Sequence, residues 1–244
     1  MTGEVILTGM VILAAPANEY DKRVVILTRE RGKITAFAKG AKRSKSQLAA
    51  GTRPFSFGEF TCYAGRTAYT LVSVKIENYF EEITENMENV CYGSYFLEMA
   101  DYFGMENVEA KKMLLLLYQS LRALTKRSLD NRLVRRIFEL KILVINGEYP
   151  NVFQCMGCGK EEGLNGFSRM MHGMLCGECQ SRDRIELSAS AVYTMQYIVS
   201  AEIGKLYTFS VSEEVLAEIG MVMNRLVEGY VDRKFRSLEL LGIL

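Results

Sequence analysis

Four of the six cysteines stand in two pairs whose spacing is typical of a metal site. Cys155 and Cys158 form one C-x-x-C pair, and after seventeen intervening residues Cys176 and Cys179 form the second. Two thiolates three positions apart on a tight turn can share one metal ion, and two such turns complete a tetrahedral site. Because four thiolates leave no open coordination position, we predict one structural Zn²⁺ held by all four cysteines.

Other interpretations of these cysteines stay open. C-x-x-C pairs also occur in thiol–disulfide exchange enzymes, and four free thiols are a second alternative. No strand–helix–strand pattern of the thioredoxin type surrounds either pair. His172, the single histidine, lies between the pairs and is a further ligand candidate. Gly157, Gly159 and Gly177 favour the metal, since small residues let backbone amides turn toward the sulfur atoms.

Charge is segregated along the chain, although the formal net charge is only +1. Residues 22–66 carry eleven basic and two acidic side chains, and residues 110–141 carry nine and two. Residues 77–109, between these basic segments, carry nine acids and no base. Sign asymmetry of this kind indicates polyanion binding more strongly than net charge does, so a nucleic acid is the first partner to consider.

The N-terminal third of the chain has the short, β-branched and aromatic runs of a strand-rich domain. Five such runs are separated by turn residues, near residues 5–13, 24–27, 34–38, 55–63 and 69–74. The apolar run at the N-terminus resembles a signal peptide, but Glu4 stands where a basic segment is expected, so we interpret the run as a strand. Five short strands in succession predict a small barrel.

The segment from Lys39 to Arg53 is the best nucleic-acid candidate of this barrel. It contains five basic residues and no acid: Lys39, Lys42, Arg43, Lys45 and Arg53. Small barrels of this type follow the phosphates of a single strand with Lys and Arg and stack its bases on aromatic rings. Phe37, Phe55 and Tyr63 are the aromatic candidates. The alternative is a solvated loop above a barrel that these rings fill.

Helical periodicity replaces the strand pattern after residue 81. We predict a loop-rich cysteine segment near residues 149–184, and helices near residues 86–103, 107–126, 130–146, 188–202 and 212–231. Ser210 and Glu213 form a capping-box pattern before the last helix. In the third helix Arg132, Arg135 and Arg136 fall largely off the apolar stripe, which makes them a second DNA-binding candidate. Amphipathic helices often carry arginine toward solvent, so a purely structural role is the alternative.

The motifs of common enzyme classes do not occur in the sequence. A phosphate-binding loop ending at Gly32 and Lys33 would need glycine where Leu27 stands, which argues against ATP-driven action. One histidine and scattered acids offer no hydrolase or nuclease site. The apolar runs fall short of the roughly 18–20 residues of a membrane-spanning helix. We therefore predict a cytoplasmic protein that is not an enzyme and has no membrane partner.

Several longer stretches carry a likeness to one family, in chain order Leu27–Ile34, Lys39–Lys45, Pro54–Ser56, Phe138–Leu143, Gly147–Pro150, Cys155–Gly159 and Arg233–Leu241. The first three resemble the N-terminal domain of RecO, the bacterial DNA repair and recombination-mediator family. The next three are similar to its helical and zinc-binding region, and the last is similar to its C-terminal signature. The likeness covers essentially the whole chain in the family's order.

This resemblance implies a multidomain α+β chain. It implies an N-terminal OB-fold, a five-stranded β-barrel that binds nucleic acid, over residues 1–80. It also implies an α-helical domain over residues 81–244 with a four-cysteine zinc-ribbon insertion at residues 149–184. The family binds single- and double-stranded DNA, anneals complementary strands, and works with RecR. Together they help load RecA onto DNA coated by the single-strand binding protein SSB.

The resemblance also implies the C-terminal tail of SSB as a partner, RecA as an indirect one, and association with the bacterial nucleoid during repair. Two other classes stay open. One is a zinc-ribbon RNA-binding or transcription accessory protein. The other is a thiol redox enzyme that uses the C-x-x-C pairs.

Overall fold

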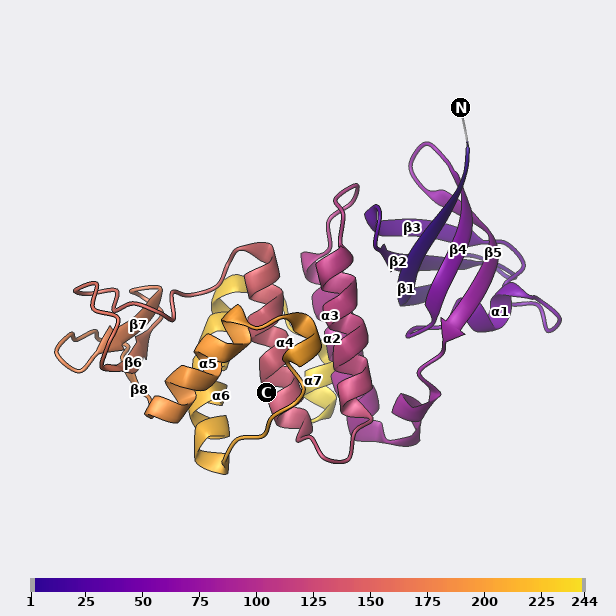
Figure 1. Ribbon diagram of the computed structural model, residues 1–244. Coiled ribbons are helices and arrows are strands. Elements are labelled where there is room, and N and C mark those ends of the chain that lie inside the picture. The colour runs from indigo at the N-terminus through magenta and orange to yellow at the C-terminus, as the bar shows by residue number, and fades with distance from the viewer. Residues whose placement is uncertain (1–2, 243–244) are drawn as a thin grey trace. The chain divides into compact units, whose positions relative to one another are not determined.

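A computed structural model describes residues 3–242, which divide into two units (Figure 1). The first unit comprises residues 3–125 together with residues 236–242. The second unit comprises residues 126–235. The segment from Lys39 to Arg53, which we call the basic segment from here on, belongs to the first unit, and the paired cysteines belong to the second.

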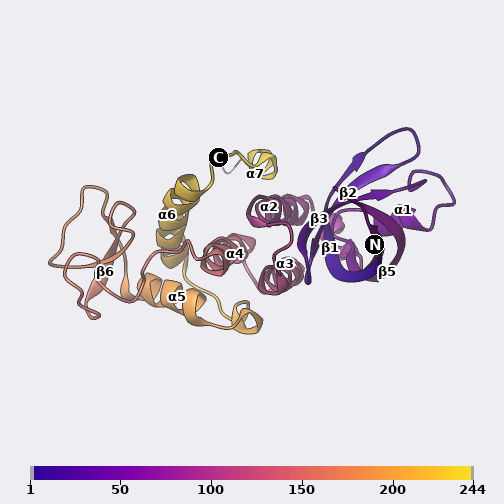
Figure 2. The same cartoon turned by 90° about the horizontal axis from the view of Figure 1, so that it is seen from above.

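Among the described residues, five strands form the barrel of the first unit (Figure 2). Their bounds are Glu4–Pro16 (β1), Lys22–Thr28 (β2), Gly32–Ala38 (β3), Phe57–Ala64 (β4) and Tyr69–Asn78 (β5). β4 pairs with both β1 and β5, so the order β1-β2-β3-β5-β4 closes the barrel. Within the part of the barrel that the structure describes, β3 and β5 pair in parallel, and the other four strand pairs are antiparallel. This is the small five-stranded barrel of an OB-fold, which confirms the prediction.

Side chains of the barrel strands alternate between its interior and its outer surface. The interior is apolar, and its buried members include Leu7, Val24, Ile26, Ile34, Phe60 and Leu71. Val25 and Leu27 alternate with these residues along β2 but are buried as well. Helix α3 (Lys111–Leu124) packs against β2, so both faces of this strand are covered. Covering on both faces explains why β2 is an unbroken apolar run in the sequence.

The first unit also contains α2 and several short helices. Their bounds are Leu48–Gly51 (α1), Glu81–Glu85 (η1), Met87–Phe103 (α2) and Arg236–Leu240 (α7). Asn86 caps α2, because its side chain accepts a hydrogen bond from the Glu88 amide. α7 packs on α2, where the Ser237 hydroxyl donates to Glu98 at 2.6 Å. The C-terminal segment thus returns to the first unit, which the sequence did not predict.

The second unit is built on α4 (Asn131–Asn146), α5 (Ala189–Ser200) and α6 (Glu213–Tyr230), with the short η2 (Ile203–Lys205). α4 contacts both α5 and α6. Ser212 caps α6 by accepting a hydrogen bond from the Val215 amide at 3.4 Å. The predicted capping box at Ser210 is therefore wrong, because Ser212 already satisfies a free amide of the first turn. Among residues 3–242, no helix is both long and apolar enough to cross a membrane.

The cysteine segment contains a small antiparallel sheet where the sequence predicted loops. Its strands are Leu164–Ser168 (β6), Gly173–Cys176 (β7) and Ile185–Glu186 (β8), in the order β7-β6-β8. Strands this short and rich in glycine carry little periodicity, so they are hard to recognise in a sequence. β7 ends on Cys176, so the sheet positions one of the predicted ligands.

Candidate metal centre and nucleic-acid surface

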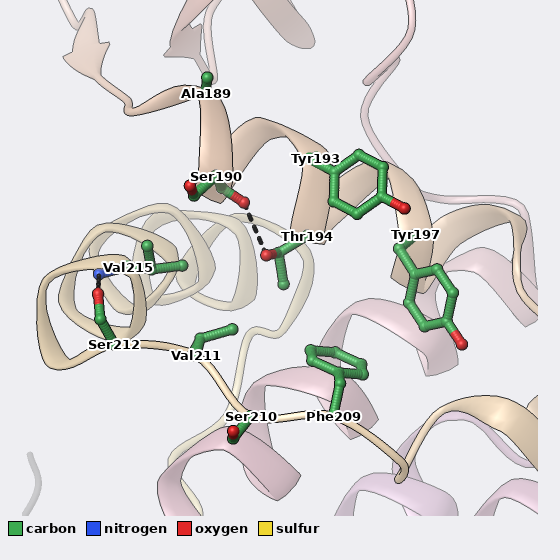
Figure 3. A pocket seen from close by; sticks show the side chains of 10 residues that line it. All are labelled: Ala189, Ser190, Tyr193, Thr194, Tyr197, Phe209, Ser210, Val211, Ser212 and Val215. Carbon is green, nitrogen blue, oxygen red and sulfur yellow. Dashed lines mark hydrogen bonds between the residues drawn. The ribbon is translucent and has the colours of Figure 1, made fainter.

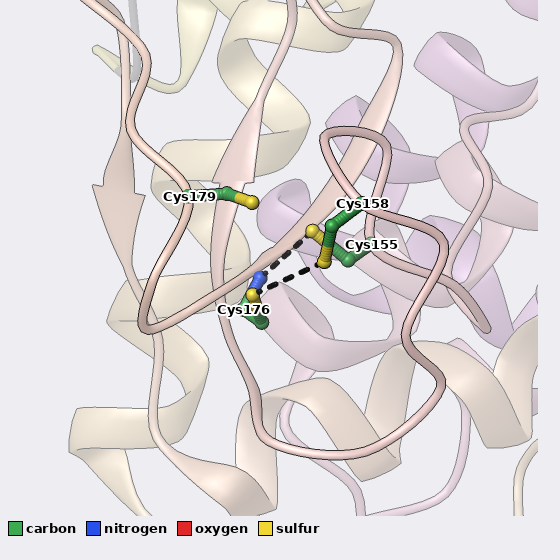
Figure 4. A group of neighbouring side chains, drawn as sticks. All are labelled: Cys155, Cys158, Cys176 and Cys179. Carbon is green, nitrogen blue, oxygen red and sulfur yellow. Dashed lines mark hydrogen bonds between the residues drawn. The ribbon is translucent and has the colours of Figure 1, made fainter.

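The two cysteine pairs come together at one point of the second unit (Figure 4). Their four sulfur atoms all lie within 4.8 Å of one another, and Cys158 Sγ is 3.7 Å from Cys176 Sγ. Zn–S bonds of about 2.3 Å in a tetrahedron place sulfur atoms about 3.8 Å apart. The four side chains therefore stand close to the spacing that one tetrahedral metal ion requires.

Both C-x-x-C pairs form tight turns, which we call the first knuckle (residues 155–158) and the second knuckle (residues 176–179). The Gly159 amide donates to Cys155 O at 2.8 Å, and the Cys179 amide donates to Cys176 O at 3.2 Å. Gly159 has a φ of +78°, a left-handed conformation that glycine adopts without strain. The Cys176 amide also donates to Cys155 Sγ at 3.3 Å, so the second knuckle stabilises a thiolate of the first.

Within this cluster the pKa values of Cys155 and Cys179 shift in opposite directions. Burial raises the pKa of Cys155, but amides of Cys176, Cys158 and Gly157 outweigh this effect and lower the pKa to about 6. The pKa of Cys179 rises to about 12, chiefly through side-chain hydrogen bonds with the other three cysteines. Four thiols this close cannot all ionise unless a cation offsets their charge. The donor set fits a thiolate-binding divalent ion such as Zn²⁺.

Lys160, Glu178 and Arg184 contact each other or the knuckles without offering a thiolate, and His172 lies in a separate turn. Lys160 Nζ lies 2.6 Å from Glu178 Oε2, so an exposed ion pair links the second knuckle to a residue that directly follows the turn of the first. Arg184 donates hydrogen bonds to main-chain oxygens of the second knuckle. His172 is exposed in the turn between β6 and β7. Among the described residues, it lies outside the group of side chains that could hold a metal ion.

The basic segment joins β3 to β4 and contains α1. All five of its basic side chains are exposed: Lys39, Lys42, Arg43, Lys45 and Arg53. Two backbone contacts tie its first part to the turn between β1 and β2. The Gly40 amide donates to the Asp21 carboxylate at 2.7 Å, and the Lys42 amide donates to Tyr20 O at 2.9 Å. The Arg43 guanidinium lies over the Tyr20 ring, 5.1 Å from its centroid. These contacts hold the first part of the basic segment against the β1–β2 turn, while its charged side chains remain exposed.

The strand register places an arginine and two aromatic rings in one row on the outside of the barrel. Thr70 is paired with Phe37 across β3 and β5, and with Tyr63 across β4 and β5. Arg23 is paired with Phe37 across β2 and β3. Directly paired residues point to the same face of a sheet. Arg23, Phe37 and Tyr63 therefore share the outer surface, and each of them is exposed.

Arg23 was not among the predicted DNA-binding residues. The sequence could have predicted that Arg23 points outward, because it precedes the apolar run of β2 and side chains alternate between the two faces of a strand, with Val24 and Ile26 inside the barrel. The pairing with Phe37 could not be read from the sequence, since it depends on the register between two strands. We call Arg23, Phe37 and Tyr63 the outer row.

Phe55 is not available for stacking on a nucleobase. Its side chain is buried, and its φ is +73°. The ring lies against α2, because a Cβ atom added at Gly93 would stand 3.1 Å from Phe55 Cε1. The expectation that Phe55 belongs to a nucleic-acid surface is therefore wrong, since the ring packs inside the first unit.

The predicted arginines of α4 are bound by carboxylates of the second unit. Arg135 and Arg136 both contact Glu139, at 2.7 and 2.9 Å, and their side chains are only 6% and 11% exposed. Arg132 is 53% exposed and also pairs with two carboxylates. Removing one partner of a buried ion pair costs on the order of 3–5 kcal/mol. This cost argues against direct phosphate contact by Arg135 and Arg136, and it leaves Arg132 as the exposed member of the predicted set.

A cavity of about 720 Å³ opens between α5 and the segment that leads into α6 (Figure 3). The rings of Tyr197 and Phe209 meet edge to face in its wall, with centroids 5.3 Å apart. Tyr193 also lines the cavity and is 69% exposed. Neither the cysteine cluster nor the predicted DNA-binding residues contribute to its walls.

A five-stranded OB-fold barrel with an exposed basic connection, followed by a helical unit with a four-cysteine centre, is the architecture of a nucleic-acid-binding protein. Two family models match the chain. Recombination protein O N terminal matches residues 1–80, and Recombination protein O C terminal matches residues 84–239. The chain belongs to the RecO family of DNA repair proteins.

Individual relatives match nearly the whole chain. The DNA repair protein RecO of Acetivibrio thermocellus is 31% identical over 241 residues, which cover 97% of this chain and 96% of the relative. The protein of the same name from Symbiobacterium thermophilum is 32% identical over 242 residues, with 97% and 96% coverage. The one from Clostridium novyi is 30% identical over 238 residues, with 97% and 93% coverage. These matches do not favour an RNA-binding or transcription accessory protein.

Proposed function

We propose that this protein is a recombination mediator in DNA repair. It binds single- and double-stranded DNA, anneals complementary strands and, with RecR, helps load RecA onto single strands coated by SSB. It does so without catalysing a covalent step. The observation that carries this proposal is the exposed basic connection on an OB-fold barrel, in a chain that belongs to the RecO family.

The barrel, residues 1–80, is the DNA-binding domain in this proposal. Lys39, Lys42, Arg43, Lys45 and Arg53 contact phosphates, and the outer row provides rings on which unpaired bases stack. The exposure of all these side chains supports the assignment. So does the anchoring of the basic segment, because a charged group held near its bound position loses less conformational freedom on binding.

Phosphate neutralisation supplies the mechanism of annealing. Two DNA strands repel each other through their phosphates, and a cationic surface that binds one strand lowers the repulsion felt by the second. The bases pair by themselves once the strands are close. The same reduction of repulsion assists the transfer of a coated strand to RecA, and none of these steps needs ATP hydrolysis by this chain.

The helical domain, residues 81–244, carries the zinc-binding insertion at residues 149–184. Cys155, Cys158, Cys176 and Cys179 would hold one Zn²⁺, and the closeness of their sulfur atoms supports this assignment. A closed four-cysteine site supplies structural cross-linking rather than catalysis. The cysteines would join the two knuckles and thereby order the small sheet against which α5 packs.

The remaining assignments rest on membership of the RecO family. RecR, the SSB C-terminal tail and, indirectly, RecA are the proposed partners, and the bacterial cytoplasm with its nucleoid is the proposed location. Arg132 is a secondary DNA contact in this proposal, because its side chain reaches solvent.

An annealing assay tests the proposed function. Complementary DNA strands coated with SSB are mixed with the protein in the absence of ATP, and duplex formation is followed over time. The proposal expects faster annealing than with SSB alone, and a matched pair of RNA strands separates a DNA mediator from an RNA-binding protein. No acceleration of DNA annealing would contradict the proposal.

A further inference from the structure

We infer that Arg184 is a positioning residue of the metal centre, which holds the second knuckle closed through its main-chain oxygens. This inference rests on the proposed metal site and concerns a residue that offers no ligand atom. It assigns to the site a basic side chain that the cysteine spacing does not reveal, since Arg184 lies outside both C-x-x-C pairs.

The contacts of Arg184 span the second knuckle from end to end. Its Nη1 donates to Cys176 O at 3.0 Å and to Cys179 O at 2.8 Å. These two oxygens belong to the first and last residues of the turn. One nitrogen atom that binds both fixes their separation, and the separation of the two ligand side chains depends on it.

The guanidinium is itself held by side chains of the small sheet. Nε donates to Glu186 Oε1 at 2.6 Å, and Nη2 donates to Glu186 Oε2 at 3.1 Å and to Asn165 Oδ1 at 2.8 Å. The Arg184 side chain is only 6% exposed although its Glu186 partner reaches solvent. All three guanidinium nitrogens are therefore engaged, and the planar fork has one orientation.

Gly166 provides the space that the guanidinium occupies. A Cβ atom added at this glycine would stand well inside van der Waals contact with Arg184 Cζ. Gly166 is paired with Glu186 across β6 and β8, so the sheet register sets both the space and the carboxylate. A larger residue at position 166 would displace Arg184 while leaving every cysteine unchanged.

Charge adds to the effect of geometry. Four thiolates and one Zn²⁺ together carry a net charge of −2, and a buried guanidinium beside them offsets part of it. Lys160 also carries a positive charge near the knuckles, but its ion pair with Glu178 is exposed and so contributes little. An ammonium at position 184 would keep the charge but lacks the planar fork that reaches both carbonyls and Glu186.

Zinc competition on the full chain tests the inference. Zinc affinity is measured against a chromogenic chelator for the wild type, Arg184→Met, Arg184→Lys and Gly166→Ala, with Arg182→Met as control. Arg182 is exposed and lies two positions away, so its replacement removes the same charge from the same segment. Outer-shell partners of metal ligands typically contribute roughly 10- to 100-fold to affinity. We expect a loss of about this size for Arg184→Met, a smaller one for Arg184→Lys and Gly166→Ala, and none for Arg182→Met.

The rise in melting temperature on adding zinc is the second readout, because it reports metal affinity separately from the stability of the fold. A positioning role predicts a smaller zinc-dependent rise in Arg184→Met and Gly166→Ala. An Arg184→Met protein with wild-type zinc affinity and an unchanged rise would overturn the inference. If Arg184→Met does not fold, wild-type affinity in both Arg184→Lys and Gly166→Ala overturns it equally. A wild-type protein that takes up no zinc contradicts the metal site itself.

Discussion

Phe37 and Tyr63 flank Thr70 on the outer surface of the barrel, although they lie on strands that do not pair with each other. Thr70 on β5 is paired with Phe37 of β3 on one side and with Tyr63 of β4 on the other. Both rings are exposed, at 39% and 44%. Exposed rings spaced across neighbouring strands are the feature on which OB-folds stack successive bases.

Replacing these two rings tests whether the outer row contacts unpaired bases. We expect Phe37→Ala and Tyr63→Ala each to weaken binding of a single strand by about 1–3 kcal/mol, the usual contribution of one base–aromatic stack. Duplex binding should change less, because its bases are already stacked. Fluorescence anisotropy with labelled single and double strands measures both effects.

Tyr149→Ala is the control, since Tyr149 lies on the second unit and is 42% exposed. Equal losses for Tyr149→Ala and Tyr63→Ala would show that the outer row has no special part in binding.

Arg135 is buried and Arg132 is exposed, so we expect their replacement by alanine to change the stability of the protein by different amounts. Arg135→Ala should lower the free energy of unfolding by about 1.5–3 kcal/mol, the usual contribution of a hydrogen bond to a charged group, because the buried Glu139 loses Arg135 but keeps Arg136. Arg132→Ala removes two exposed ion pairs and should cost only about 1 kcal/mol. Urea unfolding followed by circular dichroism distinguishes the two. Similar stabilities for both variants would contradict the buried role of Arg135.

Removing one cysteine should release the metal. We expect Cys155→Ser to lose most of the bound zinc and to melt at a lower temperature than the wild type, because structural zinc binding contributes directly to folding. Elemental analysis of the purified protein and thermal melts measure the two effects. A strong chelator should lower the melting temperature of the wild type but leave the variant unchanged. A wild-type protein with no zinc, or a variant with a full equivalent, would argue against the site.

The lowered pKa of Asp183 leads us to expect that the protein loses stability in acid. Burial raises its pKa, but hydrogen bonds from Ser168, Ser181 and the Met170 amide outweigh burial and lower the pKa to about 2. A carboxylate with a lowered pKa stabilises the fold above its unfolded value near 3.8, and this contribution disappears as pH falls toward 2.

The metal-free protein is the right sample for this test, since acid also protonates zinc-binding thiolates. The urea midpoint of the wild type should fall more steeply between about pH 4 and about pH 2 than that of Asp183→Asn. Parallel curves for the two proteins would show that Asp183 does not cause the acid dependence.

The sequence predicted the features that depend on the spacing of residues close together in the chain. Each cysteine pair spans only four residues, and the barrel strands are rich in β-branched and aromatic residues. The helix from Asn131 to Asn146 has a clear apolar period of about 3.6 residues. What it did not predict depends on contacts between distant segments or on side-chain burial. Arg135 and Arg136 lie off the apolar stripe, yet a buried Glu139 on the same helix binds both. The Phe55 ring packs against Gly93 of α2, which is distant in the sequence, and the contacts of Arg184 depend on the register of β6 and β8.

The salt dependence of binding to single-stranded DNA tests the central claim most directly. For the wild type, the logarithm of affinity should fall linearly with the logarithm of salt concentration, by roughly 0.7 for each phosphate contacted. Replacing Lys39, Lys42, Arg43 and Lys45 together with alanine should weaken binding and flatten this slope. The control removes four exposed charges outside both basic segments, at Arg169, Arg182, Lys205 and Lys234, and should keep a slope near that of the wild type. A wild-type affinity that does not depend on salt concentration would contradict the account. So would a fourfold alanine variant of the basic segment whose salt dependence has the wild-type slope.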